Sequence, residues 1–114
     1  MITFDDLRAA NVLRCEKSFH PINEWSPTDW ACALAGEVGE TCNAVKKLCR
    51  MDSGGNTKKD PQTVKEAIGE IAEELGDLIT YADLLAARLG IDLEKAVRDK
   101  FNKVSDRMNS NIKL

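Results

Sequence analysis

The sequence has 114 residues, of which 43% are hydrophobic, so it is long enough to form one compact domain with a core of its own. Its 16 basic and 19 acidic residues leave a net charge of only -3, which argues against a nucleic-acid polymer as partner and against an acidic disordered tail. The apolar runs are too short to cross a membrane, and the first residues lack the basic start of a signal peptide. We therefore expect a single domain over residues 1–114, located in the cytoplasm and without membrane association.

The first predicted helix follows Thr3 and runs to about Ser18. Thr3 is its expected cap, because Asp6 stands three residues further on and can return the capping bond. Pro21 disfavours helical angles in the residue before it. The segment 19–26 is therefore predicted to be an ordered loop, and it is rich in aromatic rings.

A second helix is predicted from Ser26 to about Met51. Ser26 can cap it, Pro27 suits its first position, and Asp29 can return the capping bond. The stretch 52–60 that follows is polar and contains glycine, with no apolar period. We expect that stretch to be a mobile loop.

The third predicted helix begins at Pro61 and ends near Leu89, with Gly90 as a left-handed terminator. The fourth begins at Ile91–Asp92, and its apolar residues are expected to face inward. These are Leu93, Val97, Phe101, Val104 and Met108.

Four amphipathic helices with short connections, and no strand-like alternation, predict an all-α fold. The expected architecture is an antiparallel four-helix bundle. The third helix carries more apolar surface than a lone bundle of this size easily covers. We therefore expect a homodimer or a homotetramer.

The four cysteines stand at positions 15, 32, 42 and 49, and no two form a Cys-x-x-Cys pair. With one histidine in the whole chain, this spacing does not suit a zinc site. We expect reduced thiols that pack as small hydrophobic side chains, because the apolar content is sufficient for a core without disulfides.

Two pairs of acidic residues interrupt apolar stripes of the second and third helices. Glu37 lies inside the stripe of the second helix and Glu40 on its border, whereas Glu74 and Asp77 interrupt the third helix with the same offset of three residues. The stripe of the second helix comprises Leu34, Val38, Thr41, Val45 and Leu48. That of the third comprises Val64, Ile68, Ile71, Leu75, Leu78, Ala82 and Leu85.

A single Glu-x-x-Glu pair is common on a solvated helix face, but two pairs on apolar stripes of two long helices call for cations. Four carboxylates between two helices would repel one another strongly. Oxygen ligands without histidine or thiolate favour magnesium or manganese, which often share their ligand shell with phosphates. A ferritin-like di-iron site would need Glu-x-x-His, and neither helix has one.

Three segments resemble the all-α nucleoside triphosphate pyrophosphohydrolases, the MazG-like proteins and dimeric dUTPases. They are Leu34-Ala-Gly-Glu-Val-Gly-Glu40, Glu73-Glu-Leu-Gly-Asp-Leu78 and the tail from Gly90 to Arg107. The resemblance covers roughly residues 25–107. It implies a helical hydrolase that cleaves a nucleoside triphosphate to the monophosphate and pyrophosphate, and suggests a role in removing non-standard nucleotides.

The same resemblance implies that the magnesium ligands and catalytic residues are Glu37, Glu40, Glu74 and Asp77. Gly36 departs from the family pattern, which often has an acid at that position. Any role of that acid is therefore missing here or supplied by another residue.

Several further residues are candidates for substrate binding. Lys47 follows Glu37 and Glu40 on one helical face, with Asn43 one row over; its alternative is a solvated lysine near a helix end. The resemblance implies that Lys100 and Asn102 contact the substrate. Without the resemblance, the basic ridge of Lys100, Lys103 and Arg107 next to Asn102 is interpreted as a solvated helix face.

The aromatic loop offers a place for a nucleotide base. A base ring can stack on Trp25 or Phe19 while His20 bonds its edge, and the resemblance implies that aromatic residues at this place contribute to the base pocket. The alternatives are a turn hydrogen bond for His20 and a hydrophobic staple between Trp25 and Trp30, which stands at the fourth helical position.

Two other functions compete with nucleotide hydrolysis. In the first, the chain is a noncatalytic helical module for oligomerisation or interaction, and its acids are surface charges. In the second, the same metal site hydrolyses a diphosphate that is not a nucleotide.

Overall fold

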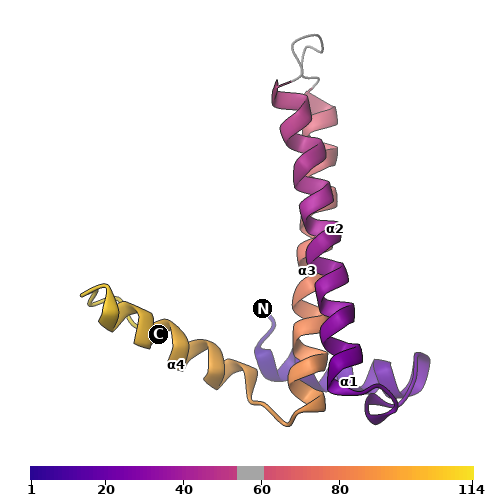
Figure 1. Cartoon of the computed structure of the whole chain (residues 1–114), viewed down its shortest axis with the longest axis vertical. Helices are drawn as coiled ribbons and strands as arrows, with labels where there is room; N and C mark the ends of the chain where they lie inside the picture. The colour runs from indigo at the N-terminus through magenta and orange to yellow at the C-terminus, as the bar shows by residue number, and fades with distance from the viewer. Residues whose placement is uncertain (54–60) are drawn as a thin grey trace. The chain divides into compact units, whose positions relative to one another are not determined.

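The computed structural model of the chain describes residues 1–53 and 61–114, which form four α-helices and a short 3-10 helix (Figure 1). The elements are α1 (Phe4–Ser18), η1 (Ile22–Glu24), α2 (Pro27–Ser53), α3 (Pro61–Arg88) and α4 (Leu93–Arg107). No strand occurs in these residues, so the predicted all-α fold is confirmed. None of the described helices combines the length and the apolarity that a membrane span requires.

The α2 helix ends at Ser53 and α3 ends at Arg88, each within two residues of the predicted end. A mobile loop was predicted for residues 52–60. Residues 54–60 lie outside the described part of the chain, and residues 52 and 53 belong to the last turn of α2.

Local capping explains where the helices begin and end. Thr3 Oγ1 accepts from the Asp6 backbone N–H at 3.0 Å, and the Asp6 carboxylate accepts from the Thr3 N–H at 2.9 Å, so the predicted capping box is present. Ser26 and Asp29 form the same pair of bonds at the start of α2. Gly90 adopts a φ of 68°, which lets the chain turn out of α3 as predicted.

The contacts within the chain divide it into two compact units. The first contains residues 1–24 and 83–114, and the second contains residues 25–82. The unit boundary falls within α3, so that α1, η1, the last turns of α3 and α4 belong to the first unit, whereas α2 and most of α3 form the second.

The first unit is held together by the buried carboxylate of Asp83. Its side chain is 1% exposed and accepts from Arg8 Nε at 2.8 Å and from Asn11 Nδ2 at 3.1 Å. Arg8 Nη2 also donates to the Ile91 carbonyl at 2.9 Å. Arg8 therefore ties α1 to the end of α3 through the ion pair and to the turn before α4 through a hydrogen bond. The cost of burying the Asp83 charge is offset by its bonds to Arg8 and Asn11.

The second unit is a pair of antiparallel helices that lie side by side (Figure 1). Trp30 at the start of α2 is fully buried, and its ring centroid is 6.3 Å from that of Tyr81 near the end of α3. Ala44 and Ala67 are buried further along the same pair of helices. These residues mark the seam along which α2 and α3 pack.

The predicted inward stripes of α2 and α3 are only partly correct. Leu34, Thr41 and Leu48 are half-buried, but Val38 and Val45 are 44% and 40% exposed. On α3 the corresponding exceptions are Ile68 and Leu75, which are 53% and 47% exposed. The apolar arc of each helix is wider than the seam, so one edge of it faces away from the partner helix.

The inward face predicted for α4 is also wrong in part. Leu93 and Val104 are half-buried, whereas Val97, Phe101 and Met108 are exposed. The helix has the predicted amphipathic pattern, but its own unit covers only part of the apolar side.

The cysteines are thiols, as predicted, but only Cys15 packs as a core residue. Its Sγ donates to the His20 carbonyl at 3.1 Å, and burial raises the pKa of the thiol. The other three are exposed on α2, so the prediction of buried packing is wrong for Cys32, Cys42 and Cys49.

Candidate metal centre

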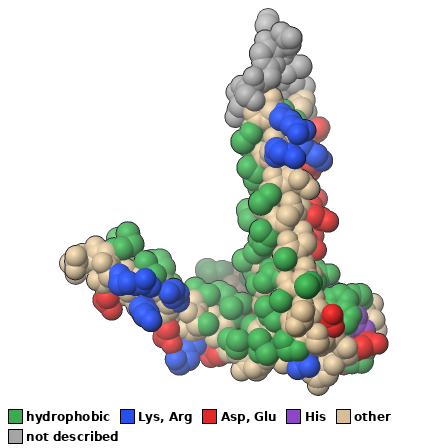
Figure 2. All heavy atoms as spheres, viewed as in Figure 1, with side chains coloured by type: hydrophobic (Ala, Val, Ile, Leu, Met, Phe, Trp, Pro, Cys, Tyr) green, Lys and Arg blue, Asp and Glu red, His purple; other side chains and the backbone are tan. Residues whose placement is uncertain are grey.

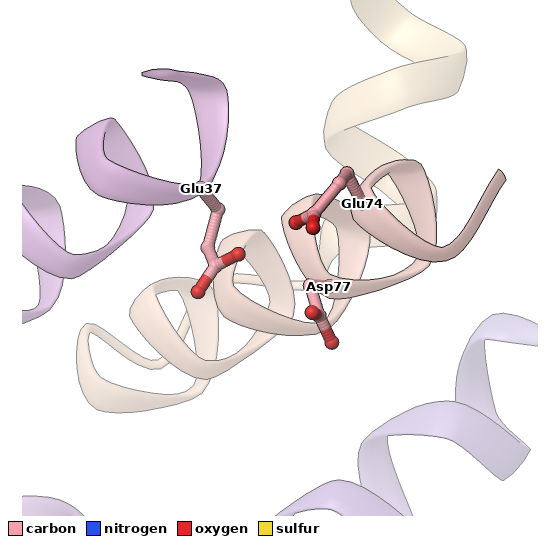
Figure 3. A group of neighbouring side chains, drawn as sticks. All are labelled: Glu37, Glu74 and Asp77. Carbon is pink, nitrogen blue, oxygen red and sulfur yellow. The ribbon is translucent and has the colours of Figure 1, made fainter. Parts of the chain in front are cut away.

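Three carboxylates converge across the seam between α2 and α3. Each of Glu37, Glu74 and Asp77 has an oxygen within 4.8 Å of an oxygen of the other two. Figure 3 shows the Glu37 side chain extending from α2 toward the two side chains of α3. Such a spacing allows a single ion to contact all three residues.

The helical register explains this convergence. Glu37 and Glu74 sit on the seam itself and are half-buried, whereas Asp77 lies at its border and is exposed. Because Glu74 and Asp77 are three residues apart, they project from the same face of α3. Thr41 also lies on the seam, but its hydroxyl donates to the Glu37 backbone carbonyl at 2.9 Å and not to a carboxylate.

Glu40 joins this cluster through Glu74. Their carboxyl groups are close enough to share a hydrogen bond when Glu74 is protonated, and the charge of Glu40 also acts on Glu37. The four acids singled out in the sequence are thus neighbours in the structure.

The cluster is electrostatically unfavourable without a cation. Burial raises the pKa of Glu37, and the charges of Asp77 and Glu40 raise it further. Burial also raises the pKa of Glu74, followed by the charge of Glu40 and the hydrogen bond with it. Among the described residues, neither Glu37 Oε2 nor Glu74 Oε2, both buried, finds a hydrogen-bond partner.

These observations fit a hard divalent cation. Carboxylate oxygens are the ligands that magnesium and manganese prefer, and no histidine or thiol belongs to the cluster. A cation would neutralise the repulsion and satisfy the two buried oxygens of Glu37 and Glu74. The donor set is therefore chemically suited to Mg²⁺ or Mn²⁺.

A hollow of about 270 Å³ adjoins the cluster. Asn43 and Lys47, which the sequence suggested as substrate-binding residues, are on its wall next to Glu40 and Glu74. The full lining is Glu40, Asn43, Ala44, Lys47, Glu70 and Glu74. Glu70 was not anticipated, although its position four residues before Glu74 places it on the same face of α3.

Trp25 lies in the second unit, where it packs against Trp30. The two ring centroids are 4.7 Å apart and the rings are tilted by 58°. Since Trp30 is fully buried, the staple predicted for these two rings is confirmed. Trp25 itself is half-buried.

The remaining candidates for substrate binding belong to the first unit. The Nδ1 atom of His20 is 2.9 Å from the Pro21 carbonyl and 3.8 Å from Glu24 Oε2, so the alternative of a turn contact for His20 is realised. Asn102 bonds the last residue: its Nδ2 donates to the Leu114 carbonyl at 3.1 Å and its Oδ1 accepts from the Leu114 N–H at 2.8 Å. Lys100 is exposed on the same helix.

The sequence is similar to those of known proteins over most of its length. Residues 26–111 match the family model of the MazG nucleotide pyrophosphohydrolase domain. Over 79 residues the chain is also 32% identical to the "Gene 37 protein" of Mycobacterium phage L5, a match that covers 69% of this chain and 63% of that protein. The aligned part thus spans less than two thirds of the phage protein. Because the family model covers most of the sequence, the chain belongs to the MazG nucleotide pyrophosphohydrolase family.

Proposed function

We propose that this chain hydrolyses a nucleoside triphosphate to the nucleoside monophosphate and pyrophosphate, with Mg²⁺ or Mn²⁺ as cofactor. The observation that carries the proposal is the convergence of Glu37, Glu74 and Asp77 within 4.8 Å in a chain of this family. Acidic residues that serve only as surface charges have no reason to gather on the seam between two helices. Burial on this seam raises the pKa values of Glu37 and Glu74, as is common at functional sites.

In this proposal the four acids hold the cofactor. Glu37 and Glu74 contribute the two buried oxygens that lack partners among the described residues, and Glu40 and Asp77 contribute more exposed carboxylates. When bound, the divalent cation supplies positive charge that neutralises phosphate oxygens and lowers the pKa of water. The seam keeps the side chains of Glu37 and Glu74 in place through packing, so little reorganisation is needed.

Lys47 and Asn43 are proposed to bind the triphosphate. Both line the hollow that Glu40 and Glu74 also line, so an anion in it would be within reach of the Lys47 ammonium. The ammonium donates to phosphate oxygens and offsets their charge, and the Asn43 amide donates a neutral hydrogen bond. These two side chains thereby orient the phosphate chain toward the acids.

We further propose that Trp25 and His20 contact the base, and that Lys100 and Asn102 contact the nucleotide. Trp25 is half-buried, which leaves part of it accessible for stacking. Binding through Asn102 requires its amide to exchange the two bonds with Leu114 for bonds to the nucleotide. Non-standard nucleotides, whose removal would make this a house-cleaning enzyme, are the proposed substrates.

The experiment is a product analysis across common, deoxy and chemically damaged nucleoside triphosphates. Phosphorus NMR distinguishes pyrophosphate from inorganic phosphate, and each reaction is run with Mg²⁺, with Mn²⁺ and with EDTA. We expect at least one nucleotide to give pyrophosphate and monophosphate, and only with metal. Turnover restricted to a diphosphate without a base, or none with either metal, would contradict the proposal.

A further inference from the structure

Residues 109–114 turn back along α4 instead of extending away from it (Figure 1). Asn109 adopts a φ of 55°, in the left-handed region that asparagine visits more readily than most residues, and the chain reverses there. The Ser110 N–H donates to the Ser105 carbonyl at 2.8 Å, as in a Schellman motif. The Ile112 N–H donates to the Ser110 hydroxyl at 3.1 Å. We name residues 109–114 the return segment.

The return segment reaches the side chain of Asn102 on α4. Asn102 Nδ2 donates to the Leu114 carbonyl at 3.1 Å, and Asn102 Oδ1 accepts from the Leu114 N–H at 2.8 Å. One residue of the segment thus engages a donor and an acceptor of the side-chain amide side by side. While Leu114 is bound, the half-buried amide cannot form the same pair of bonds with another ligand.

The return segment is held by exposed polar contacts. The Lys113 ammonium pairs with the Asp106 carboxylate and donates to the Asn102 backbone carbonyl at 3.4 Å. No side chain of the segment is buried, and Ile112 and Leu114 are 71% and 63% exposed. Such contacts contribute little net free energy, and ordering the segment costs conformational entropy. The closed and released states of the segment are therefore expected to lie close in free energy, so a ligand can shift the balance between them.

The basic residues of α4 stay open while the segment is closed. Figure 2 shows Lys and Arg side chains gathered on this helix. Lys100, Lys103 and Arg107 are exposed, and none of them forms an ion pair with a residue that the structure describes. The return segment therefore occupies the Asn102 amide but leaves the Lys100 ammonium available. We expect the segment to weaken nucleotide binding without abolishing it.

We propose that the return segment is an intramolecular competitor of the nucleotide for Asn102. In the closed state Leu114 holds the side-chain amide, and in the released state the same donor and acceptor bind the nucleotide. Phosphate oxygens only accept hydrogen bonds, so a phosphate replaces one of the two bonds with Leu114. A nucleobase edge presents a donor beside an acceptor and replaces both. This inference rests on the proposed function, in which Asn102 contacts the nucleotide, and adds a regulation of that contact.

The competition has a defined size. A segment that is closed in about 70–90% of the free molecules raises the apparent Kd of the nucleotide about three- to tenfold, because only the released molecules offer the Asn102 amide. The effect is reciprocal, so bound nucleotide displaces the segment to the same extent. The Leu114 N–H should then exchange with solvent faster in the nucleotide complex than in the free protein.

The test compares variants by calorimetric titration with the α,β-imido analogues of dATP, dCTP, dGTP and dUTP in Mg²⁺. Leu114→Pro removes the N–H that bonds Asn102 Oδ1, and should lower the Kd of each analogue that binds by about threefold or more. Leu114→Ala is the matched control, because it keeps the backbone groups and changes only an exposed side chain, so its Kd should equal that of the parent. Lys113→Ala is a second opening variant, which should also lower the Kd although it removes a positive charge.

Two further titrations tie the effect to Asn102 and to the base. In an Asn102→Ala background, Leu114→Pro should no longer change the Kd. Imidodiphosphate, which has no base, should bind the parent and Leu114→Pro equally. Equal Kd values of the parent and Leu114→Pro for a nucleotide analogue, or the same tightening with imidodiphosphate, would overturn the inference and leave the proposed function standing. Absence of binding of every analogue to every variant would contradict the proposed function, and the inference with it.

Discussion

Glu37 of α2 and Asp77 of α3 bring carboxylate oxygens within 4.8 Å of each other across a helix seam. Two like charges at such a distance destabilise the folded chain unless protons or cations compensate them. The helix pair is therefore expected to be more stable with a bound divalent cation than without one. In the proposed function, stability and catalysis depend on the same side chains.

Glu37→Gln should separate these two effects. The substitution removes a half-buried charge with a raised pKa, so the EDTA-treated variant should melt at a higher temperature than the EDTA-treated parent at neutral pH. Mg²⁺ at a hundred times its Kd should stabilise the parent by about 2.7 kcal/mol and the variant much less. Pyrophosphate release should fall about a hundredfold or more. A variant that is less stable than the parent in EDTA would contradict this reasoning.

The metal-free protein should lose stability as the pH rises through the acidic range. The pKa values of Glu37 and Glu74 are raised above 4.5 in the folded chain, so between 4.5 and the raised values the folded state binds more protons than the unfolded state. The free energy of unfolding then falls with increasing pH. Urea titrations in EDTA, from mildly acidic to neutral pH, should show a steeper fall for the parent than for Glu74→Gln.

Lys47→Ala should weaken substrate binding because its ammonium lines the hollow beside Glu40 and Glu74. Loss of a charged hydrogen bond costs about 1.5–3 kcal/mol, which predicts an increase in KM of roughly tenfold or more. Lys46→Ala is the control, because Lys46 is exposed and does not line the hollow. Equal kinetic effects of the two substitutions would remove Lys47 from the proposed site.

Arg8→Ala should strongly destabilise the first unit. It leaves the Asp83 carboxylate, which is 1% exposed, with the Asn11 amide but without its cation, at a cost of about 3 kcal/mol. Arg98→Ala breaks an exposed pair with Glu94 at 3.2 Å and should cost less than about 0.5 kcal/mol. Urea denaturation measures the free energy of unfolding of both variants. A loss for Arg8→Ala as small as that expected for Arg98→Ala would show that the pair with Asp83 does not stabilise the fold.

Much of the fold follows from local rules in the sequence. Thr3, Ser26 and Gly90 act on a few neighbouring residues, so their capping roles need no knowledge of the rest of the chain. The acidic pairs were equally visible, because an offset of three residues fixes a common helical face. For the same reason the neighbourhood of Asn43 and Lys47 could be predicted.

Long-range choices were harder to predict. The apolar arc of each helix is wider than the contact with the partner helix, so the sequence does not indicate which edge of the arc is buried. Val38 and Leu75 lie on the edge that faces away from the partner helix. The pairing of Arg8 with Asp83 joins residues 75 positions apart and has no local signal. Glu70 stood out less than Glu74 because exposed glutamates are common on helices.

The most direct measurement is a titration of the metal-free protein with Mn²⁺, followed by electron paramagnetic resonance, which reports free ions. The carboxylate cluster predicts saturable binding in the absence of nucleotide, lost or weakened about tenfold or more in Glu37→Gln and in Asp77→Asn but retained in Glu94→Gln, an exposed acid of α4. Absence of saturable binding, or binding that is unchanged in Glu37→Gln and Asp77→Asn, would show that these carboxylates do not form a metal centre.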